Sequence, residues 1–169
     1  MPLPPWNDHG LLPLGVHRAE LPDLYERFVL DAPCQQHREI LHGALVTHLT
    51  LIRTVIPMGT AWISGSFSTR AEEPPKDVDV VILPTDWRAL LGLATEAEAR
   101  LYGLLTLQQV QVAQPAVYLD RLQPVGGAVD AFLCYPGHED VWRGRWSAVR
   151  TEPSGEATNQ SKGYAEVVW

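Results

Sequence analysis

Residues 61–84 read AWISGSFSTRAEEPPKDVDVVILP and contain the stretch that decides the fold. An apolar run ends at Gly65-Ser66, a polar spacer follows, and a second apolar run begins with Asp77 and Asp79. Because side chains alternate across a strand, the two carboxylates share one face while Val78 and Val80 share the other. The pattern predicts a strand over residues 61–64, a turn, and a second strand over residues 77–83.

The two acids suggest a cation site, and the turn before them suggests a phosphate site. Neighbouring carboxylates repel each other, whereas Mg²⁺ prefers carboxylate and phosphate oxygens. Glycine at a strand end allows backbone N–H groups to approach a phosphate closely. The alternatives are an ordinary turn and a solvated strand end. The apolar run VVIL after Asp79 favours a central strand whose acids face a cleft.

This motif resembles the signature of the polymerase-β-type nucleotidyltransferase superfamily in its minimal bacterial form: Gly-Ser, ten residues, then Asp-Val-Asp. Residues 12–17 and the turn at 65–69 also resemble an uncharacterised bacterial group of such proteins. The resemblance implies an α/β (α+β) nucleotidyltransferase-like fold, with a short, mixed, twisted sheet flanked by helices mainly on one side. It also implies a Mg²⁺-dependent or Mn²⁺-dependent enzyme that moves a nucleoside monophosphate from an NTP to a hydroxyl.

The acceptor implied by the resemblance is RNA, such as a tRNA end, or a protein. Small members of the superfamily often belong to toxin–antitoxin or antiviral systems, which implies a possible cognate partner protein. The alternative is a catalytically silent protein of the same fold that binds and neutralises a partner. An intact set of acids disfavours this alternative, because a silent copy has no reason to keep carboxylates that repel each other.

The superfamily uses a third carboxylate on a neighbouring strand. Asp130, inside the apolar run AVDAFLC at 128–134, is the first candidate, and Asp120 is the rival. By resemblance, Asp130 accepts a proton from the attacking hydroxyl. Asp77, Asp79 and Asp130 together are the expected catalytic and metal-binding residues. The expected nucleotide-binding residues, whose alternative is plain solvation, are Gly65, Ser66, Ser68, Thr69, Arg70 and Lys76.

Length and composition fit a single domain over residues 1–169 with an extended N-terminal arm over about 1–16. A net charge of −7 argues against a protein that coats nucleic acid non-specifically. The N-terminal residues lack the pattern of a signal peptide, and no apolar run reaches membrane-spanning length. Cys34 and Cys134 are expected as reduced thiols. The chain is therefore expected to be cytoplasmic and without a membrane partner.

The strongest helix is predicted over residues 33–57, where Leu41, Leu45, Leu49 and Ile52 draw one apolar stripe. Its three histidines are spread around the cylinder and are interpreted as structural. Further helices are predicted over 20–30, 87–93, 95–105 and 139–149. Strands are predicted over 116–119 and 128–134, a polar loop over 152–163 and a closing edge strand over 164–169. Residues 107–112 fit a strand or a continued helix.

Overall fold

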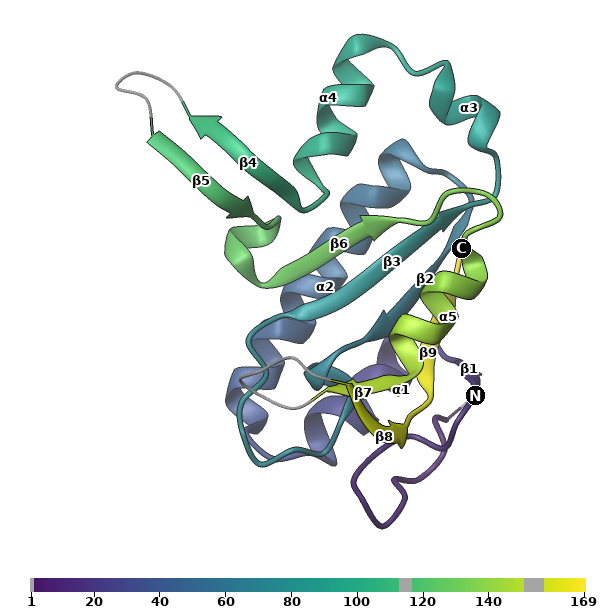
Figure 1. Ribbon diagram of the computed structural model, residues 1–169, viewed down its shortest axis with the longest axis vertical. Coiled ribbons are helices and arrows are strands. Elements are labelled where there is room, and N and C mark those ends of the chain that lie inside the picture. Colours follow the sequence, from purple (N-terminus) through teal and green to yellow (C-terminus); the bar gives the residue numbers. More distant parts are fainter. Residues whose placement is uncertain (1, 113–116, 151–156) are drawn as a thin grey trace.

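The computed structural model describes residues 2–112, 117–150 and 157–169, and it is built around one mixed sheet (Figure 1). The sheet has five strands in the order β1-β9-β2-β3-β6. β2 runs antiparallel to both β3 and β9, whereas β3 is parallel to β6 and β1 is parallel to β9. The predicted mixed α/β class is confirmed. The strands are β1 Val16–Arg18, β2 Gly59–Ser64, β3 Val78–Pro84, β6 Val129–Leu133 and β9 Tyr164–Val168.

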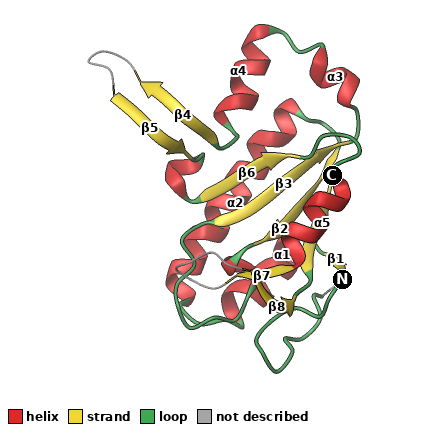
Figure 2. Ribbon diagram, in the orientation of Figure 1, coloured by secondary structure: helices red, strands yellow, loops and turns green. Residues whose placement is uncertain are grey.

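The long helix α2, Gln35–Val55, covers one face of this sheet (Figure 2). Its stripe of Leu41, Leu45, Leu49 and Ile52 is buried, as the spacing predicts. The helix begins two residues after Pro33 and ends two residues before Pro57, because proline is tolerated at a helix start and cannot continue a helix. This face of the sheet and α2 together form the main hydrophobic core.

The opposite face of the sheet is covered in part by α5, Glu139–Ser147. Trp146 of this helix packs with Trp62, Val81 and Tyr164 in a second, smaller core. Leu24, Phe28 and Leu101 from other helices join the core on the α2 side, so the helices lie mainly on one side, as predicted. α5 lies on the second face because Trp62 and Tyr164 project large apolar surfaces there, and these must be buried.

The remaining elements connect these layers. β4 and β5 form an antiparallel hairpin that projects away from the sheet, so the ambiguous residues 107–112 are a strand (Figure 1). Cys34 and Cys134 are free thiols, as expected. The other bounds are α1 Leu21–Tyr25, a π-helical segment Glu26–Leu30, a 3-10 turn Ser66–Ser68, α3 Trp87–Leu91, α4 Thr95–Gly103, β4 Leu107–Val112, β5 Val117–Leu122, a 3-10 turn Val125–Gly127, β7 Ala148–Arg150 and β8 Ala157–Ser161.

Two predictions about the C-terminal part are wrong. The predicted loop over 152–163 contains β8, which pairs with β7; residues 151–156 of that loop lie outside the described part. β9 is not an edge strand, because β1 pairs with it on its outer side. The N-terminal arm supplies this edge: Tyr164 N donates to the Gly15 carbonyl at 3.1 Å, where the arm turns into β1. In the described ranges no helix combines the length and apolar character that a membrane crossing requires.

Candidate functional site

Three aspartates gather on one face of the sheet, at the N-terminal ends of β3 and β6. Asp79 and Asp130 are direct partners in the parallel register of these strands. Adjacent strands lie about 4.8 Å apart, so the two side chains project side by side. Asp77 precedes β3 by one residue and shares their face by alternation. Asp120 is exposed on β5, next to Arg121, whose side chain is the one turned toward Asp130. The fold therefore brings Asp130, and not Asp120, to the pair.

Asp79 is the electrostatic centre of this group. Burial first, and then the charges of Asp77 and Asp130, raise the pKa of its carboxyl from 3.8 to about 6. Lys162 and Arg121 oppose that shift. No hydrogen bond joins the Asp79 carboxylate to any residue in the part of the chain that the structure describes. A partly buried carboxylate with like charges beside it is the kind of group that a cation stabilises.

Gly65 ties the turn to the second strand of the motif. Its φ is +73°, in the left-handed region that favours glycine. A Cβ atom at this position would overlap the carboxylate of Asp79. Ser64, the preceding residue, is the register partner of Asp79 across β2 and β3. Glycine is therefore required at position 65 for two reasons, the backbone conformation and the close approach of the Asp79 carboxylate. The Gly-Ser turn and the Asp-Val-Asp strand of the sequence motif thus meet at one point.

A buried lysine that the sequence motif does not include supports the same turn. The ammonium of Lys162 donates to Ser64 Oγ at 2.8 Å, to the Gly65 carbonyl at 3.1 Å and to Ser68 Oγ at 2.8 Å. These contacts use its three N–H donors. Burial lowers the pKa of Lys162 to about 8, while Asp79 acts in the opposite direction, so the ammonium remains mostly charged at neutral pH.

Arg38 of α2 holds the turn from the other side. Its guanidinium is fully buried and donates to the carbonyls of Phe67 at 2.7 Å and Thr69 at 2.9 Å. A third bond, at 3.1 Å, reaches the carbonyl of Phe28 in the π-helical segment. Burial lowers the pKa of Arg38. Together with Lys162, it places two cationic groups beneath the turn that is expected to receive phosphate.

Sequence reasoning missed these two cations as site residues, because their partners are distant in the chain. Arg38 lies on a helix that reads as a plain core element, and Lys162 lies nearly a hundred positions after Ser64. One signal was available: Lys76 and Lys162 are the only lysines in the sequence, against eleven arginines. An ammonium with three donors suits a compact cage of oxygen atoms, which a planar guanidinium does not fill.

Polar side chains from the hairpin region contact the outer carboxylates. Arg121 of β5 forms an ion pair with Asp130 Oδ2, and Thr106 Oγ1 donates to Asp130 Oδ1 at 2.6 Å. Gln123 Nε2 donates to Asp77 Oδ2 at 2.6 Å. The hydrogen bond to Asp130 raises the pKa of Arg121. The carboxylates are thus approached by the turn on one side and by the hairpin on the other.

The predicted nucleotide-binding residues divide into three groups. Gly65 and Ser66 lie at the site, and Ser66 is exposed. Ser68 is buried against Lys162, and Thr69 Oγ1 donates to the Ser66 carbonyl at 2.8 Å, so these two shape the turn. Arg70 points elsewhere, because its Nε donates to the carbonyl of Asp31 at 3.3 Å. Lys76 is exposed in the segment that leads to Asp77.

The residues present suit a divalent cation in their chemistry. Within residues 2–112, 117–150 and 157–169, no three or more His, Cys, Asp or Glu side chains are close enough together to hold a metal ion by themselves. Mg²⁺, however, usually takes one or two carboxylates and completes its shell with water and substrate phosphates. Asp77 and Asp79 offer such a pair beside the turn, and Asp79 carries a buried charge that a cation would balance.

The histidines of α2 have structural partners, in agreement with their interpretation as structural residues. His37, His42 and His48 each contact a different backbone carbonyl, those of Pro75, Leu21 and Leu104. Burial lowers the pKa of both His42 and His48.

On α5, Trp146 donates to the Trp62 carbonyl at 3.1 Å, and its own carbonyl accepts a hydrogen bond from Ser64 Oγ. Arg143 stacks over Trp62 at 5.1 Å. This helix is therefore packed onto the sheet face beside the turn.

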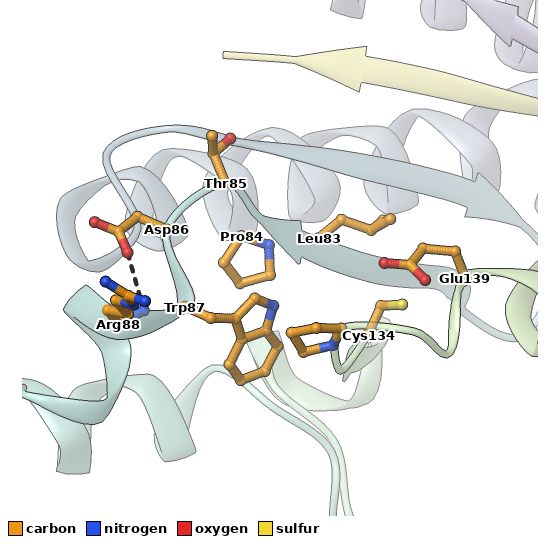
Figure 3. Close-up of a pocket in the computed structure, with 9 residues that line it drawn as sticks. Leu83, Pro84, Thr85, Asp86, Trp87, Arg88, Cys134 and Glu139 are labelled. Carbon is orange, nitrogen blue, oxygen red and sulfur yellow. Dashed lines mark hydrogen bonds between the residues drawn. The ribbon is translucent and has the colours of Figure 1, made fainter.

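A pocket of about 420 Å³ lies at the other end of β3 (Figure 3). Leu83, Pro84 and Trp87 line it, and Trp87 stacks on Tyr135 with ring centroids 4.9 Å apart. Pro84 lies five positions after Asp79 along β3, so their Cα atoms are roughly 17 Å apart. The carboxylates do not line this pocket.

A family of unknown function, DUF6932, matches residues 4–168, and the chain belongs to this family. No curated protein and no solved structure matches the chain.

Proposed function

We propose that this protein is a metal-dependent nucleotidyltransferase that moves a nucleoside monophosphate from an NTP to a hydroxyl group. One observation carries the proposal: the Gly65 turn, which suits phosphate, lies directly against Asp79, which suits a cation. Either feature alone is common. A nucleotide bound with its cation needs both at one point, because the cation must contact the carboxylates and the phosphates at the same time.

The turn has the electrostatic character that a triphosphate requires. Lys162 and Arg38 lie beneath it as buried positive groups, and their hydrogen bonds occupy carbonyl oxygens of the turn that would otherwise repel an anion. Ser66 is exposed on the turn, and its hydroxyl is assigned to the phosphates in this proposal. Such a preformed arrangement lowers the cost of ordering the site when the nucleotide binds.

In the proposed reaction, the acceptor oxygen forms a bond to the α-phosphorus while the bond to pyrophosphate breaks. Asp130 accepts the proton of the acceptor hydroxyl. Asp77 and Asp79 would hold Mg²⁺ or Mn²⁺, which supplies charge neutralisation at the phosphates when bound. The turn residues hold the triphosphate so that the α-phosphorus lies between Asp79 and the acceptor.

RNA, including a tRNA end, and protein hydroxyls are the acceptor classes of this proposal. A role in a toxin–antitoxin or antiviral system, with a cognate partner protein, is part of the same proposal and rests on the sequence resemblance. An acceptor approaches the carboxylates from the sheet face that α5 leaves uncovered.

The test is a thermal unfolding experiment with each of the four NTPs in the presence of Mg²⁺ or Mn²⁺. A ligand that binds the folded state raises Tm by mass action. We expect at least one NTP to raise the Tm of the wild-type protein, and Asp79→Asn to lose most of that rise. The matched control is Asp120→Asn, which removes an exposed carboxylate outside the site and should respond like the wild type. If no NTP shifts the wild-type Tm with either cation, the proposal fails.

A further inference from the structure

Arg121, near the end of strand β5, and Gln123, just after the strand, both contact the carboxylate group. Arg121 pairs with Asp130, and Gln123 donates to Asp77 at 2.6 Å. Two of the three acids are therefore held from a single strand end, and Asp79 between them is not.

Arg121 covers Asp130 from the solvent side. The side chain of Asp130 is 7% exposed, whereas that of Arg121 is 46% exposed. Thr106 holds the other oxygen of Asp130 from within and also accepts a hydrogen bond from the Ala131 backbone. Thr106 is thus part of the sheet edge, while Arg121 is a half-solvated group that can move without breaking the core.

The hairpin that carries Arg121 projects from the body of the protein (Figure 1). Its first strand follows Thr106, whose N–H donates to the Ala131 carbonyl at 2.8 Å. Its second strand ends at Leu122, just before Gln123. The side chains of Arg121 and Gln123 therefore fasten the base of a projecting element to the site, and their release would leave the sheet intact.

A divalent cation held by Asp77 and Asp79 would lie beside Asp130, because Asp79 and Asp130 are register partners on adjacent strands, and it would therefore compete with the guanidinium of Arg121 for this group of charges. The doubly charged ion binds oxygen more strongly than a half-exposed guanidinium does, and it repels that guanidinium once it is bound. A triphosphate bound with the cation at the Gly65 turn then offers the released guanidinium a new anionic partner. Arginine suits this exchange, because its planar fork binds carboxylate and phosphate with the same bidentate geometry.

We infer that Arg121 is a built-in counter-ion of the carboxylate group, which a divalent cation displaces from Asp130 and which then binds the phosphates of the NTP. The inference rests on the proposed function. It makes Arg121 a substrate-binding residue in the loaded protein and a competitor of the cation in the empty one. The consequence is two opposite effects of one substitution, which a purely structural role cannot produce.

The experiment compares the wild type with Arg121→Gln, which keeps hydrogen-bonding capacity and removes the charge. Mn²⁺ affinity is measured first without nucleotide, and then the affinity for a non-hydrolysable NTP analogue is measured at saturating Mn²⁺, both by calorimetry. We expect Arg121→Gln to bind Mn²⁺ about fivefold more tightly and the analogue about tenfold more weakly. Arg100→Gln is the matched control, because Arg100 pairs with Glu96 on exposed α4, and both affinities should stay at the wild-type level.

Arg121→Lys provides a second variant in case Arg121→Gln does not fold. It keeps the charge but not the fork, so Mn²⁺ affinity should stay near the wild-type value while the analogue binds more weakly. If the wild type binds both ligands and Arg121→Gln weakens both or changes neither, the inference about Arg121 is overturned and the proposed function stands. If the wild type binds neither Mn²⁺ nor the analogue, both are overturned.

Discussion

The two sides of the carboxylate group are built in opposite ways. On the turn side, Lys162 and Arg38 are buried, and together they make six hydrogen bonds to the turn and its surroundings. On the hairpin side, Arg121 is half exposed on an element that projects from the body. The difference separates two tasks: the turn side is fixed before a ligand arrives, whereas the hairpin side can rearrange when one binds.

The largest expected effect lies between these two sides, at Asp79. Asp79→Asn keeps the shape of the side chain and removes the charge that a cation needs, so we expect nucleotide transfer to fall by roughly three orders of magnitude. Steady-state transfer rates at saturating NTP measure this loss. Asp120→Asn is the control and should retain the wild-type rate. Transfer by Asp79→Asn within a factor of three of the wild type would exclude Asp79 as a cation ligand.

The next effect contrasts the two arginines. Arg38→Met leaves two buried carbonyls and one partly buried carbonyl without their donor and should lower the free energy of unfolding by about 3 kcal/mol. Arg121→Gln removes a half-exposed ion pair and should cost less than about 1 kcal/mol. Urea unfolding of both variants measures the contrast. Equal losses would show that the hairpin contact is as fixed as the turn contact, against the division described above.

A glycine pair sharpens the description of the fixed side. Gly65 and Gly126 have similar positive φ angles, +73° and +66°, but only a Cβ at Gly65 would meet Asp79, while one at Gly126 would meet open space. The ψ angles differ, because Gly126 (ψ 24°) has a left-handed conformation that alanine can adopt at modest cost, whereas Gly65 (ψ −164°) has one that is open essentially to glycine alone. The backbone strain and the overlap with the carboxylate therefore both act at Gly65, and we expect Gly65→Ala to be less stable than Gly126→Ala by about 2 kcal/mol. Equal destabilisation would show that neither the backbone nor the carboxylate requires glycine at position 65.

The smallest effect is a pH dependence of stability. The folded state raises the pKa of Asp79 from 3.8 to about 6, so folding takes up a proton between these pH values. The free energy of unfolding therefore falls as the pH rises through this range, and the full penalty of the ionised carboxylate is present above pH 6. Without metal, Asp79→Asn should be more stable than the wild type at pH 7 by about 1 to 2 kcal/mol after solvent screening. That advantage should shrink as the pH falls from 6 to 4. A constant advantage across this range would contradict the electrostatic cause.

Local sequence patterns predicted the parts of the fold that depend on near neighbours. The stripe of α2 and the alternation in β3 each follow from one segment, and each has the predicted form. The motif likewise predicted that Gly65 and Asp79 belong to one site. The resemblance also led us to expect the third acid on a neighbouring strand. The observed register, which places Asp130 beside Asp79, agrees with that expectation.

The missed features depend on segments far apart in the chain. Lys162 precedes Gly163, which packs against the N-terminal arm at the start of β9. A Cβ atom at Gly163 would overlap the Pro13 carbonyl, so this close packing requires glycine. β9 is interior only because the arm adds β1. Arg121 meets Asp130 because the hairpin folds back at Thr106. None of these pairings leaves a periodic signal in the sequence.

The most direct test of the central claim is label transfer from the two ends of the triphosphate. The wild-type protein is incubated with total RNA or cell lysate, Mg²⁺ or Mn²⁺, and each of the four NTPs labelled on the α-phosphate or on the γ-phosphate. We predict that α-label from at least one NTP enters a macromolecule, that γ-label does not, and that Asp79→Asn transfers neither. Transfer of γ-label alone, or no transfer from any of the four nucleotides with either cation, would contradict it.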